Sequence, residues 1–253
     1  MKLPTRTIKL NPKGICVRLI PISCIHLGHK NCNIDYARSV IKYVIDTPDT
    51  YALMLGDTCE NVLVDTMIKY RGSQHEQTIS VEQQREEARC LLRPLSESKK
   101  ILAWTESNHS LRSWYAAGFS VERTLAETLG VHFDGLEALL EIHVGRQTYY
   151  VHATHGVGSS TSIQSVTQKL EKQAARIISA DVYIRGHHHH PVIHKTTRID
   201  AKTGLIGKKL LVATGSFMEY PDSYGHRAEY NPTVLGCVKV KLYKNKWDIH
   251  ASI

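Results

Sequence analysis

The chain has 253 residues, of which 42% are hydrophobic and 22% are charged. This composition is typical of a globular protein and argues against a disordered chain or a coiled coil. The formal net charge of +8 favours anionic partners, but the Lys and Arg residues are spread along the sequence and form no basic run. A chain of this length can bury most of its apolar surface in one core, so we expect a single domain over 1–253.

The cysteines and the N-terminal residues predict a cytosolic protein. The six cysteines include no CxxC pair and no repeated spacing, which is not the pattern of a disulfide framework or a zinc ribbon. The N-terminus lacks the continuous apolar segment of a signal peptide, and no run approaches the roughly 18 apolar residues that a membrane span needs. We therefore expect a protein of a reducing compartment with no membrane partner.

In the first half, short apolar runs alternate with amphipathic stretches, which predicts an α/β layered fold. Strands are expected at 16–23, 51–55 and 101–105. Asn33 can cap a helix over 34–45, whose apolar residues recur at helical spacing. Residues 76–98 are rich in Glu, Gln, Arg and Leu and predict a long surface helix.

The second half is expected to be richer in strands. One helix is expected over 163–178, and the strands are expected at 139–144, 148–153, 182–185, 210–213 and 234–242. The aromatic residues Trp104, Trp114, Tyr149 and Tyr150 are expected in the core rather than at a base-stacking surface.

Polar clusters follow five of these apolar runs, at the C-terminal ends of the expected strands. Open α/β sheets place their sites at this edge. The clusters supply imidazoles, a carboxylate, an amide oxygen and a thiol, which suit Mn, Fe, Zn or Ni and argue against a calcium cage. They are Cys24-Ile25-His26, Gly56 to Asn61, Asn108-His109, Thr154-His155-Gly156 and Gly186 to His189.

In this order the clusters resemble the motifs DxH, GDxx(D/E), GNH(D/E), H and GHxH of the calcineurin-like metallophosphoesterases. Here they read CIH at 24–26, GDTCE at 56–60, SNHS at 107–110, THG at 154–156 and GHHH at 186–189. The resemblance implies a layered β-sandwich flanked by helices, with the site at the C-terminal ends of the strands. The first half also resembles phage and bacterial members of that family, which is compatible with a phage protein in the host cytoplasm.

The resemblance implies a site for two divalent metal ions. Asp57 would bridge both ions, His26 and His189 would hold the first with position 24, and Asn108, His155 and His187 would hold the second. His109 would act as a general acid or orient the phosphate, and Asn108 and Arg112 would contact substrate. Glu60 and Asn61 would support these residues or cap a helix. Two cations about 3.5–4 Å apart activate a bridging water and stabilise the attacking and leaving oxygens.

The sequence departs from the family pattern at two motifs. Cys24 stands where the family has aspartate, and its thiolate would be a softer ligand, while a neutral thiol would leave the first site weak. His29 is a possible substitute ligand, although the sequence favours a surface position for it. Ser107 replaces a glycine, and Ser110 replaces the acidic residue that would orient His109.

Three functions are compatible with these residues. The leading hypothesis is a phosphodiesterase or nuclease acting on DNA or RNA, since the net charge is basic. A phosphomonoesterase similar to protein phosphatases would use the same metal residues, and a degenerate binding protein would have lost catalysis through Cys24 and Ser110. A Pro- and Gly-containing loop with Tyr220, Tyr224 and His226 is a candidate cover for the site.

Overall fold

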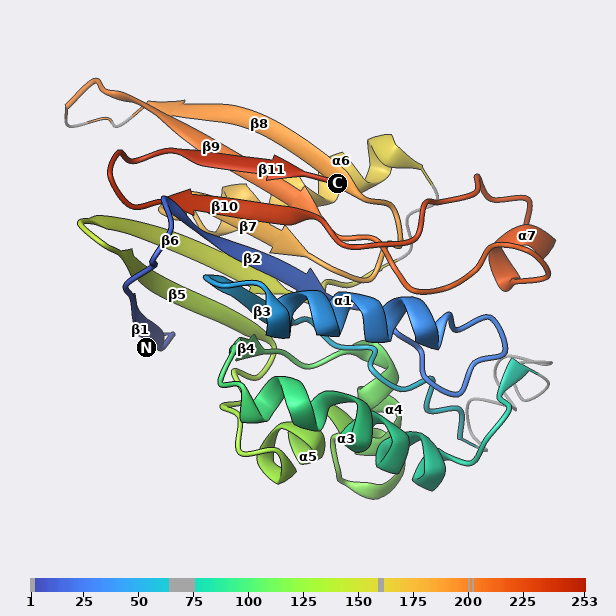
Figure 1. The fold of residues 1–253 in the computed structure, drawn as a ribbon. Coiled ribbons are helices and arrows are strands. Elements are labelled where there is room, and N and C mark those ends of the chain that lie inside the picture. The colour runs from blue at the N-terminus through green and yellow to red at the C-terminus, as the bar shows by residue number, and fades with distance from the viewer. Residues whose placement is uncertain (1–2, 64–75, 159–161, 200, 202) are drawn as a thin grey trace.

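The computed structural model describes residues 3–63, 76–158, 162–199, 201 and 203–253. Two β-sheets pack face to face, and helices cover both outer faces (Figure 1). This architecture confirms the predicted α/β sandwich flanked by helices. None of the helices in these ranges is both long enough and apolar enough to cross a membrane.

The first sheet has five strands in the order β11-β10-β2-β3-β4. Its strands β2, β3 and β4 run parallel, while β10 is antiparallel to both β2 and β11. The bounds are β2 Cys16–Ile22, β3 Thr50–Met54, β4 Ile101–Trp104, β10 Lys239–Tyr243 and β11 Ile249–Ser252.

The second sheet has six strands in the order β1-β5-β6-β7-β9-β8. Its central strands β6, β7 and β9 run parallel to one another. The bounds are β1 Thr5–Leu10, β5 Glu137–Val144, β6 Gln147–Thr154, β7 Val182–Arg185, β8 Val192–Ile199 and β9 Ile206–Ala213.

The main core lies between the two sheets. Strands of both sheets contribute to it side chains such as Leu19, Leu53, Val151 and Ile184, which are all at most 1% exposed. Alternation along β6 buries Tyr149 completely and leaves Tyr150 44% exposed. The predicted burial of this aromatic pair is therefore right for one member only.

Helices bury apolar faces against the outside of each sheet. The helices α1 (Ile34–Asp46), α3 (Val81–Glu97) and α5 (Val121–Thr128) share a second core with the first sheet, and α6 (Ile163–Arg176) packs on the second sheet. The expected cap of α1 is confirmed, because the Asn33 side chain accepts a hydrogen bond from the backbone N–H of Tyr36. Within the described ranges, the remaining helices are α4 (Asn108–Ala117) and the short α7 (Tyr224–Arg227).

Several predicted boundaries need correction. The helix expected from residue 76 begins at Val81, because Ser80 and Gln83 form a capping box there. The strand expected from residue 234 begins at Lys239. The sequence pattern missed β1, β8, β11, α4, α5 and α7. Trp114 lies on α4 and is 50% exposed, so its expected core position is wrong, whereas Trp104 is fully buried.

Candidate metal centre

The five polar clusters meet at one edge of the sandwich, because the strands that precede them end there. Hydrogen bonds to the Leu55 carbonyl, which follows β3, hold this edge together. Nδ1 of His155, which follows β6 of the other sheet, donates to it at 2.6 Å. The Ser23 hydroxyl, which follows β2 of the same sheet, donates to it at 3.0 Å. Leu55 thus joins the loop after β6 to the loops after β2 and β3.

Left-handed backbone recurs at this edge. Five of the seven predicted metal ligands have positive φ, a conformation that is uncommon outside glycine. Their φ values are 56° at Cys24, 52° at His26, 52° at Asp57, 71° at His187 and 58° at His189. Such strain persists where the surrounding structure imposes it, and it concentrates at functional sites. Here it turns side chains of adjacent loops toward a common centre.

Cys24, His26 and His189 form the first group of ligand atoms. One ligand atom from each residue lies within 4.8 Å of the other two. The Nε2 atoms of His26 and His189 are 3.3 Å apart. The Cys24 side chain is fully buried and faces this group, as expected for a residue at the first-motif position.

Asp57, Asn108 and His155 form the second group. Nε2 of His155 lies 2.8 Å from Oδ1 of Asn108 and 3.1 Å from Oδ2 of Asp57. Because Nδ1 of His155 donates its proton to Leu55, Nε2 carries the lone pair of the neutral ring. The His187 ring lies beside this group, with its centroid 5.0 Å from that of His155.

Asp57 lies between the two groups. Its Oδ2 is 3.1 Å from Nε2 of His155 and 3.8 Å from Nε2 of His26. Its Oδ1 accepts a hydrogen bond from the backbone N–H of His109 at 3.2 Å. One carboxylate thus faces imidazoles from both sides, which is the position that a bridging ligand requires.

The protonation of these groups suits a cation. Burial opposes ionisation of Asp57, but the histidines around it, above all His109 and His155, hold the pKa of this carboxyl well below its usual range. Burial likewise opposes protonation of His155, yet Asp57 raises the pKa of that imidazole. Both shifts indicate that positive charge is favoured at the point where Asp57, Asn108 and His155 converge.

The other histidines are held neutral, which leaves lone pairs for coordination. Burial lowers the pKa of His26 to about 3 and that of His187 to about 4, and it lowers the pKa of His189 well below its usual value. Burial, followed by the charge of Asp57, raises the pKa of the Cys24 thiol well above its usual value. A bound cation would favour the thiolate instead. The donor set therefore fits a divalent metal, with Cys24 as its most pH-dependent member.

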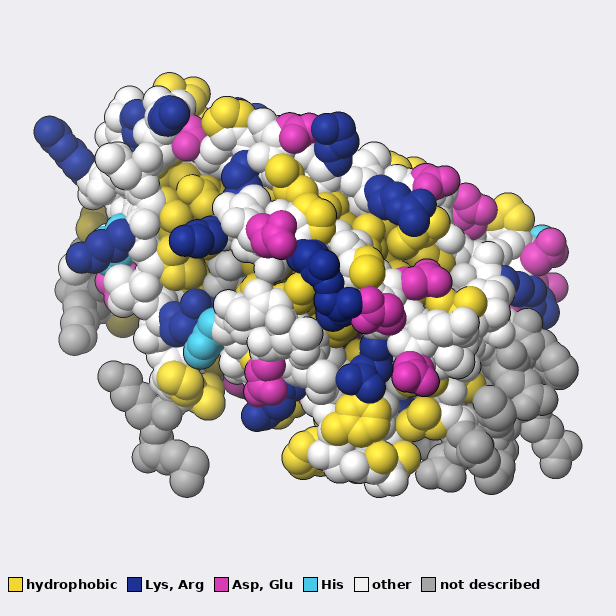
Figure 2. Space-filling view, turned by 60° about the horizontal axis from the view of Figure 1, so that its bottom comes forward, with side chains coloured by type: hydrophobic (Ala, Val, Ile, Leu, Met, Phe, Trp, Pro, Cys, Tyr) yellow, Lys and Arg dark blue, Asp and Glu magenta, His cyan; other side chains and the backbone are white. Residues whose placement is uncertain are grey.

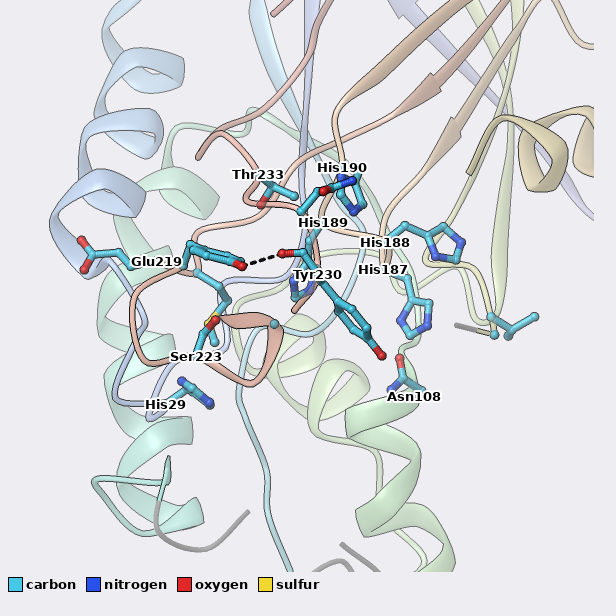
Figure 3. A pocket seen from close by; sticks show the side chains of 16 residues that line it. His29, Asn108, His187, His188, His189, His190, Glu219, Ser223, Tyr230 and Thr233 are labelled. Atoms are coloured by element: carbon cyan, nitrogen blue, oxygen red, sulfur yellow. Dashed lines mark hydrogen bonds between the residues drawn. The ribbon is translucent and has the colours of Figure 1, made fainter. Parts of the chain in front are cut away.

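The four consecutive histidines divide into two pairs. His187 faces Asn108, whereas His188 points away from it (Figure 3). Nε2 of His188 accepts a hydrogen bond from Nε of Arg185 at 2.9 Å. His189 joins the group of Cys24 and His26, and His190 is 9% exposed and lies outside that group. Only the first and third histidines of the run are thus placed at the centre.

His109 and Arg112 lie beside the centre, at the start of α4. Nδ1 of His109 donates to the Glu60 carbonyl at 2.8 Å, and its Nε2 accepts from Arg112 at 3.0 Å. The His109 ring packs edge-on against the ring of His26, with centroids 4.7 Å apart. Burial lowers the pKa of His109 to about 4, so the ring is neutral near pH 7.

Glu60 has a larger role than the motif alone indicates. Its Oε2 lies 2.8 Å from Nδ1 of His26, so His26 donates to it and directs Nε2 at the centre. The Glu60 carbonyl also receives a hydrogen bond from Arg112 at 3.0 Å. Asn61 supports the same region, since its amide donates to the carbonyl of His109 at 2.6 Å. Glu60 thus contacts His26, His109 and Arg112. These contacts require the folded loop and are not visible in the sequence.

Ser110 and His29 lie apart from the centre. The Ser110 hydroxyl is buried 3.1 Å from that of Ser120, so it takes no part in orienting His109. His29 is only 7% exposed, which corrects the expected surface position. Its Nδ1 accepts from the backbone of Asn31 at 3.0 Å, and its Nε2 lies 3.6 Å from a Glu76 oxygen.

A cavity of about 470 Å³ borders the centre on one side. His187 and His189 line it together with Tyr220 and Tyr230 of the loop that contains α7 (Figure 3). The Tyr220 hydroxyl donates to the Tyr230 carbonyl at 2.5 Å, which ties this loop together. Tyr220 thus lies where the sequence placed it, His226 is exposed, and the side chain of Tyr224 lies outside the described part of the chain.

The chain is distantly similar to several solved structures. No family model matches the chain, and a search of curated proteins found no match. The chain is similar to a solved Streptococcus pneumoniae TIGR4 protein described as a predicted phosphoesterase, at 14% identity and a TM-score of 0.40, covering 93% of this chain and 88% of that one. It is also similar to Vacuolar Protein Sorting 29 from Cryptosporidium parvum, at 15% identity and a TM-score of 0.47, with coverage of 94% and 98%.

A third solved structure is the calcineurin-like phosphoesterase YfkN from Bacillus subtilis. It matches at 15% identity and a TM-score of 0.40, covering 94% of this chain and 90% of that one. Likenesses with TM-scores below 0.5 are too distant to assign a family or an activity. The function of this chain is therefore inferred from the geometry of its own residues.

Proposed function

We propose that this protein is a metal-dependent phosphoester hydrolase that acts on phosphodiesters, with nuclease activity as the expected form. The position of Asp57 carries this proposal. Its carboxylate lies between a group that contains Cys24, His26 and His189 and a group that contains Asn108 and His155. Two sets of nitrogen, sulfur and oxygen donors that share one carboxylate are what a two-metal hydrolytic site requires.

In this proposal Cys24, His26 and His189 hold one ion, and Asn108, His155 and His187 hold the other, with Asp57 shared. Mn, Fe, Zn or Ni would suit these donors. Such ions, when bound, polarise the phosphoryl oxygens and lower the pKa of a coordinated water.

Arg112 is the side chain best placed to bind a phosphate oxygen beside the centre. Its guanidinium is held by the Glu60 carbonyl at 3.0 Å and by Nε2 of His109 at 3.0 Å. His109 is neutral in this arrangement, so we assign it first the positioning of Arg112. Its predicted role as a general acid requires Nε2 to exchange the contact with Arg112 for a proton.

The open space around the centre supports a diester rather than a monoester. Asn108 lines both the cavity beneath Tyr220 and Tyr230 and a second cavity of about 500 Å³ beside α6. A phosphodiester carries a substituent on each of two oxygens, whereas a monoester carries one. Space on both sides of Asn108 accommodates both substituents.

Cys24 favours one alternative, a binding protein without turnover. Its buried thiol has a raised pKa, because burial and the charge of Asp57 oppose the thiolate. If the thiol stayed neutral, the group with His26 and His189 would bind metal weakly. Ligand binding would then persist without catalysis.

The test is hydrolysis of bis(p-nitrophenyl) phosphate and p-nitrophenyl phosphate by metal-stripped protein, with Mn, Zn, Fe, Ni or Mg restored separately. The proposal predicts metal-dependent turnover that is faster on the diester. A preference for the monoester would indicate a phosphomonoesterase. Failure to hydrolyse either compound, in folded protein that binds metal, would indicate the binding protein.

A further inference from the structure

A second cavity, of about 500 Å³, opens directly beside the metal centre. Asn108, His155 and Gly156 form its inner end, and the side of α6 forms its outer wall. We call this cavity the α6 groove. It begins at residues that the proposed function assigns to metal and substrate, so an extended substrate leaving the centre would enter it.

Four cations line the α6 groove. Lys169, Lys172 and Arg176 are spaced by three and four residues on α6, which places them along one side of the helix. Arg185 at the end of β7 adds the fourth. The fold thus gathers basic residues that are scattered in the sequence.

Most of this positive charge is not neutralised by neighbouring side chains. Arg176 forms an ion pair with Glu137. Lys169, Lys172 and Arg185 take part in none of the ion pairs that join described residues. The Arg185 guanidinium donates instead to neutral acceptors, from Nε to Nε2 of His188 at 2.9 Å and from Nη2 to the Val157 carbonyl at 3.1 Å.

The acidic residues of the α6 groove do not cancel this charge. They are Glu106 and Glu137. The Glu137 carboxylate contacts Arg176 and also Nε2 of His152 at 2.8 Å. With Glu137 paired to Arg176, the cations Lys169, Lys172 and Arg185 share the groove with one other carboxylate, that of Glu106. The Glu106 carboxylate accepts a hydrogen bond from the backbone N–H of Ser107 at 2.9 Å.

Two of the cations approach the backbone that directly follows His155. A Cβ at Gly158 would lie 2.6 Å from Nζ of Lys169, and a Cβ at Gly156 would lie 2.7 Å from Nε of Arg185. Both glycines also have positive φ, of 95° and 80° for Gly156 and Gly158. The Lys169 ammonium and the Arg185 guanidinium thus lie against the backbone that leads away from the centre.

Apolar side chains lie next to the cations. Leu136 and Val157, which both line the α6 groove, are 70% and 72% exposed. A site that combines a basic track with accessible apolar surface is suited to a chain that carries both phosphates and unpaired bases. In a double helix the base faces are stacked inside and could not reach Leu136 or Val157.

We propose that the α6 groove binds the nucleotides adjacent to the scissile phosphate of a single-stranded nucleic acid. Lys169, Lys172 and Arg185 contact the neighbouring phosphates, and Leu136 and Val157 contact a base. This inference rests on the proposed function, since it takes the metal centre as the place where the scissile phosphate binds. The substrate is then a single-stranded nucleic acid, and the strand leaves the metal centre on the side of α6.

The test compares the Lys169→Gln/Lys172→Gln variant with wild type and with Lys9→Gln/Lys13→Gln, which removes the same charge from exposed residues at and after β1. Binding of a fluorescent single-stranded oligonucleotide to metal-stripped protein is followed by anisotropy at several salt concentrations. For the groove variant we expect Kd to rise about tenfold and the salt dependence of log Kd to fall by about 0.7 for each lost phosphate contact. The β1 variant should retain wild-type affinity.

The exposed Lys172 also provides a single variant, Lys172→Gln, that leaves the packing of α6 intact and should give a smaller loss in the same direction. Equal affinities of the groove and β1 variants for the oligonucleotide would overturn the inference. So would a duplex that binds more tightly than the single strand and loses as much affinity in the groove variant.

Hydrolysis of bis(p-nitrophenyl) phosphate separates this inference from the proposed function. The small diester places at most one substituent in the α6 groove, beside Asn108, and carries no neighbouring phosphate for Lys169 or Lys172 to contact, so the groove variant should hydrolyse it at a rate close to wild type. If the groove variant turns over the small diester at the wild-type rate and keeps its oligonucleotide affinity, the hydrolase proposal stands and binding in the α6 groove is overturned. If the groove variant binds the oligonucleotide more weakly and wild type hydrolyses no diester, binding in the α6 groove stands and the hydrolase proposal is overturned.

Discussion

The Glu60 carboxylate lies 2.8 Å from Nδ1 of His26, on the side of the imidazole opposite the metal centre. This contact fixes the tautomer of His26, since a carboxylate accepts and Nδ1 must donate. Nε2 is then left with its lone pair directed at His189 and Asp57. A carboxylate behind a ligating histidine also increases the basicity of the ring.

Replacement of Glu60 by glutamine should weaken metal binding. The amide oxygen of Glu60→Gln still accepts from His26, but the negative charge is lost. We expect affinity for Mn or Zn to fall about 10- to 100-fold by isothermal titration calorimetry. Glu76→Gln is the matched control, because Glu76 lies beside His29 and away from His26. An equal loss in both variants would argue against the specific contact.

Two adjacent histidines, His188 and His189, should differ in their effect on metal binding. His189 belongs to the group with Cys24 and His26, whereas His188 accepts from Arg185. His189→Gln should therefore lower the metal content of the purified protein, while His188→Gln should retain it. Elemental analysis by mass spectrometry measures both. Loss of metal in His188→Gln at unchanged thermal stability would contradict the assigned orientations.

Cys24 should determine which metal is preferred. An aspartate at this position supplies a hard oxygen donor that needs no thiol deprotonation, so Cys24→Asp should shift preference from Zn toward Mn. Competition between the two ions, measured at pH 7, tests this shift, with exposed Cys90→Ser as the control. Unchanged stoichiometry and preference in Cys24→Asp would show that position 24 does not face an ion.

Glu122 should make stability depend on pH. Burial raises the pKa of this carboxyl from 4.5 to about 7, although Thr58 and Trp104 donate hydrogen bonds to it. The folded state therefore holds a proton that the unfolded state releases. This contribution to stability is complete below pH 4.5 and is lost as pH rises through about 7.

The measurement is the free energy of unfolding in urea for wild type and Glu122→Gln. Between about pH 5 and 8, the stability of wild type relative to the variant should fall by about 2–3 kcal/mol. The comparison cancels the titration of histidines that both proteins share. A difference that does not change with pH would contradict the raised pKa.

Much of the centre could be predicted from the sequence because each cluster directly follows a short apolar strand. Cys24 follows β2, Asp57 follows β3, Asn108 follows β4, and His155 follows β6. Parallel strands bring such residues to one edge whatever the details of their packing. The α/β layering was predictable for the same reason, from runs whose length and composition are those of strands, whereas the β-sandwich was predicted from the resemblance to the metallophosphoesterases.

Contacts between distant segments could not be predicted in this way. The α6 groove joins Lys169 and Lys172 to Arg185 only because α6 packs on the sheet in which β7 lies. The contact of Glu60 with His26 depends on left-handed turns after β2 and β3. Edge strands such as β1 were missed because their alternating exposure leaves a weak apolar pattern.

The position of Asp57 between the two groups of ligands is tested most directly by one comparison. Metal-stripped wild type and Asp57→Asn are each given Mn or Zn, and hydrolysis of bis(p-nitrophenyl) phosphate is followed together with the amount of metal bound. We expect wild type to bind metal and turn over the diester, and Asp57→Asn to lose metal and at least about 100-fold in rate. Equal metal content and equal turnover in the two proteins would show that Asp57 does not bridge two ions.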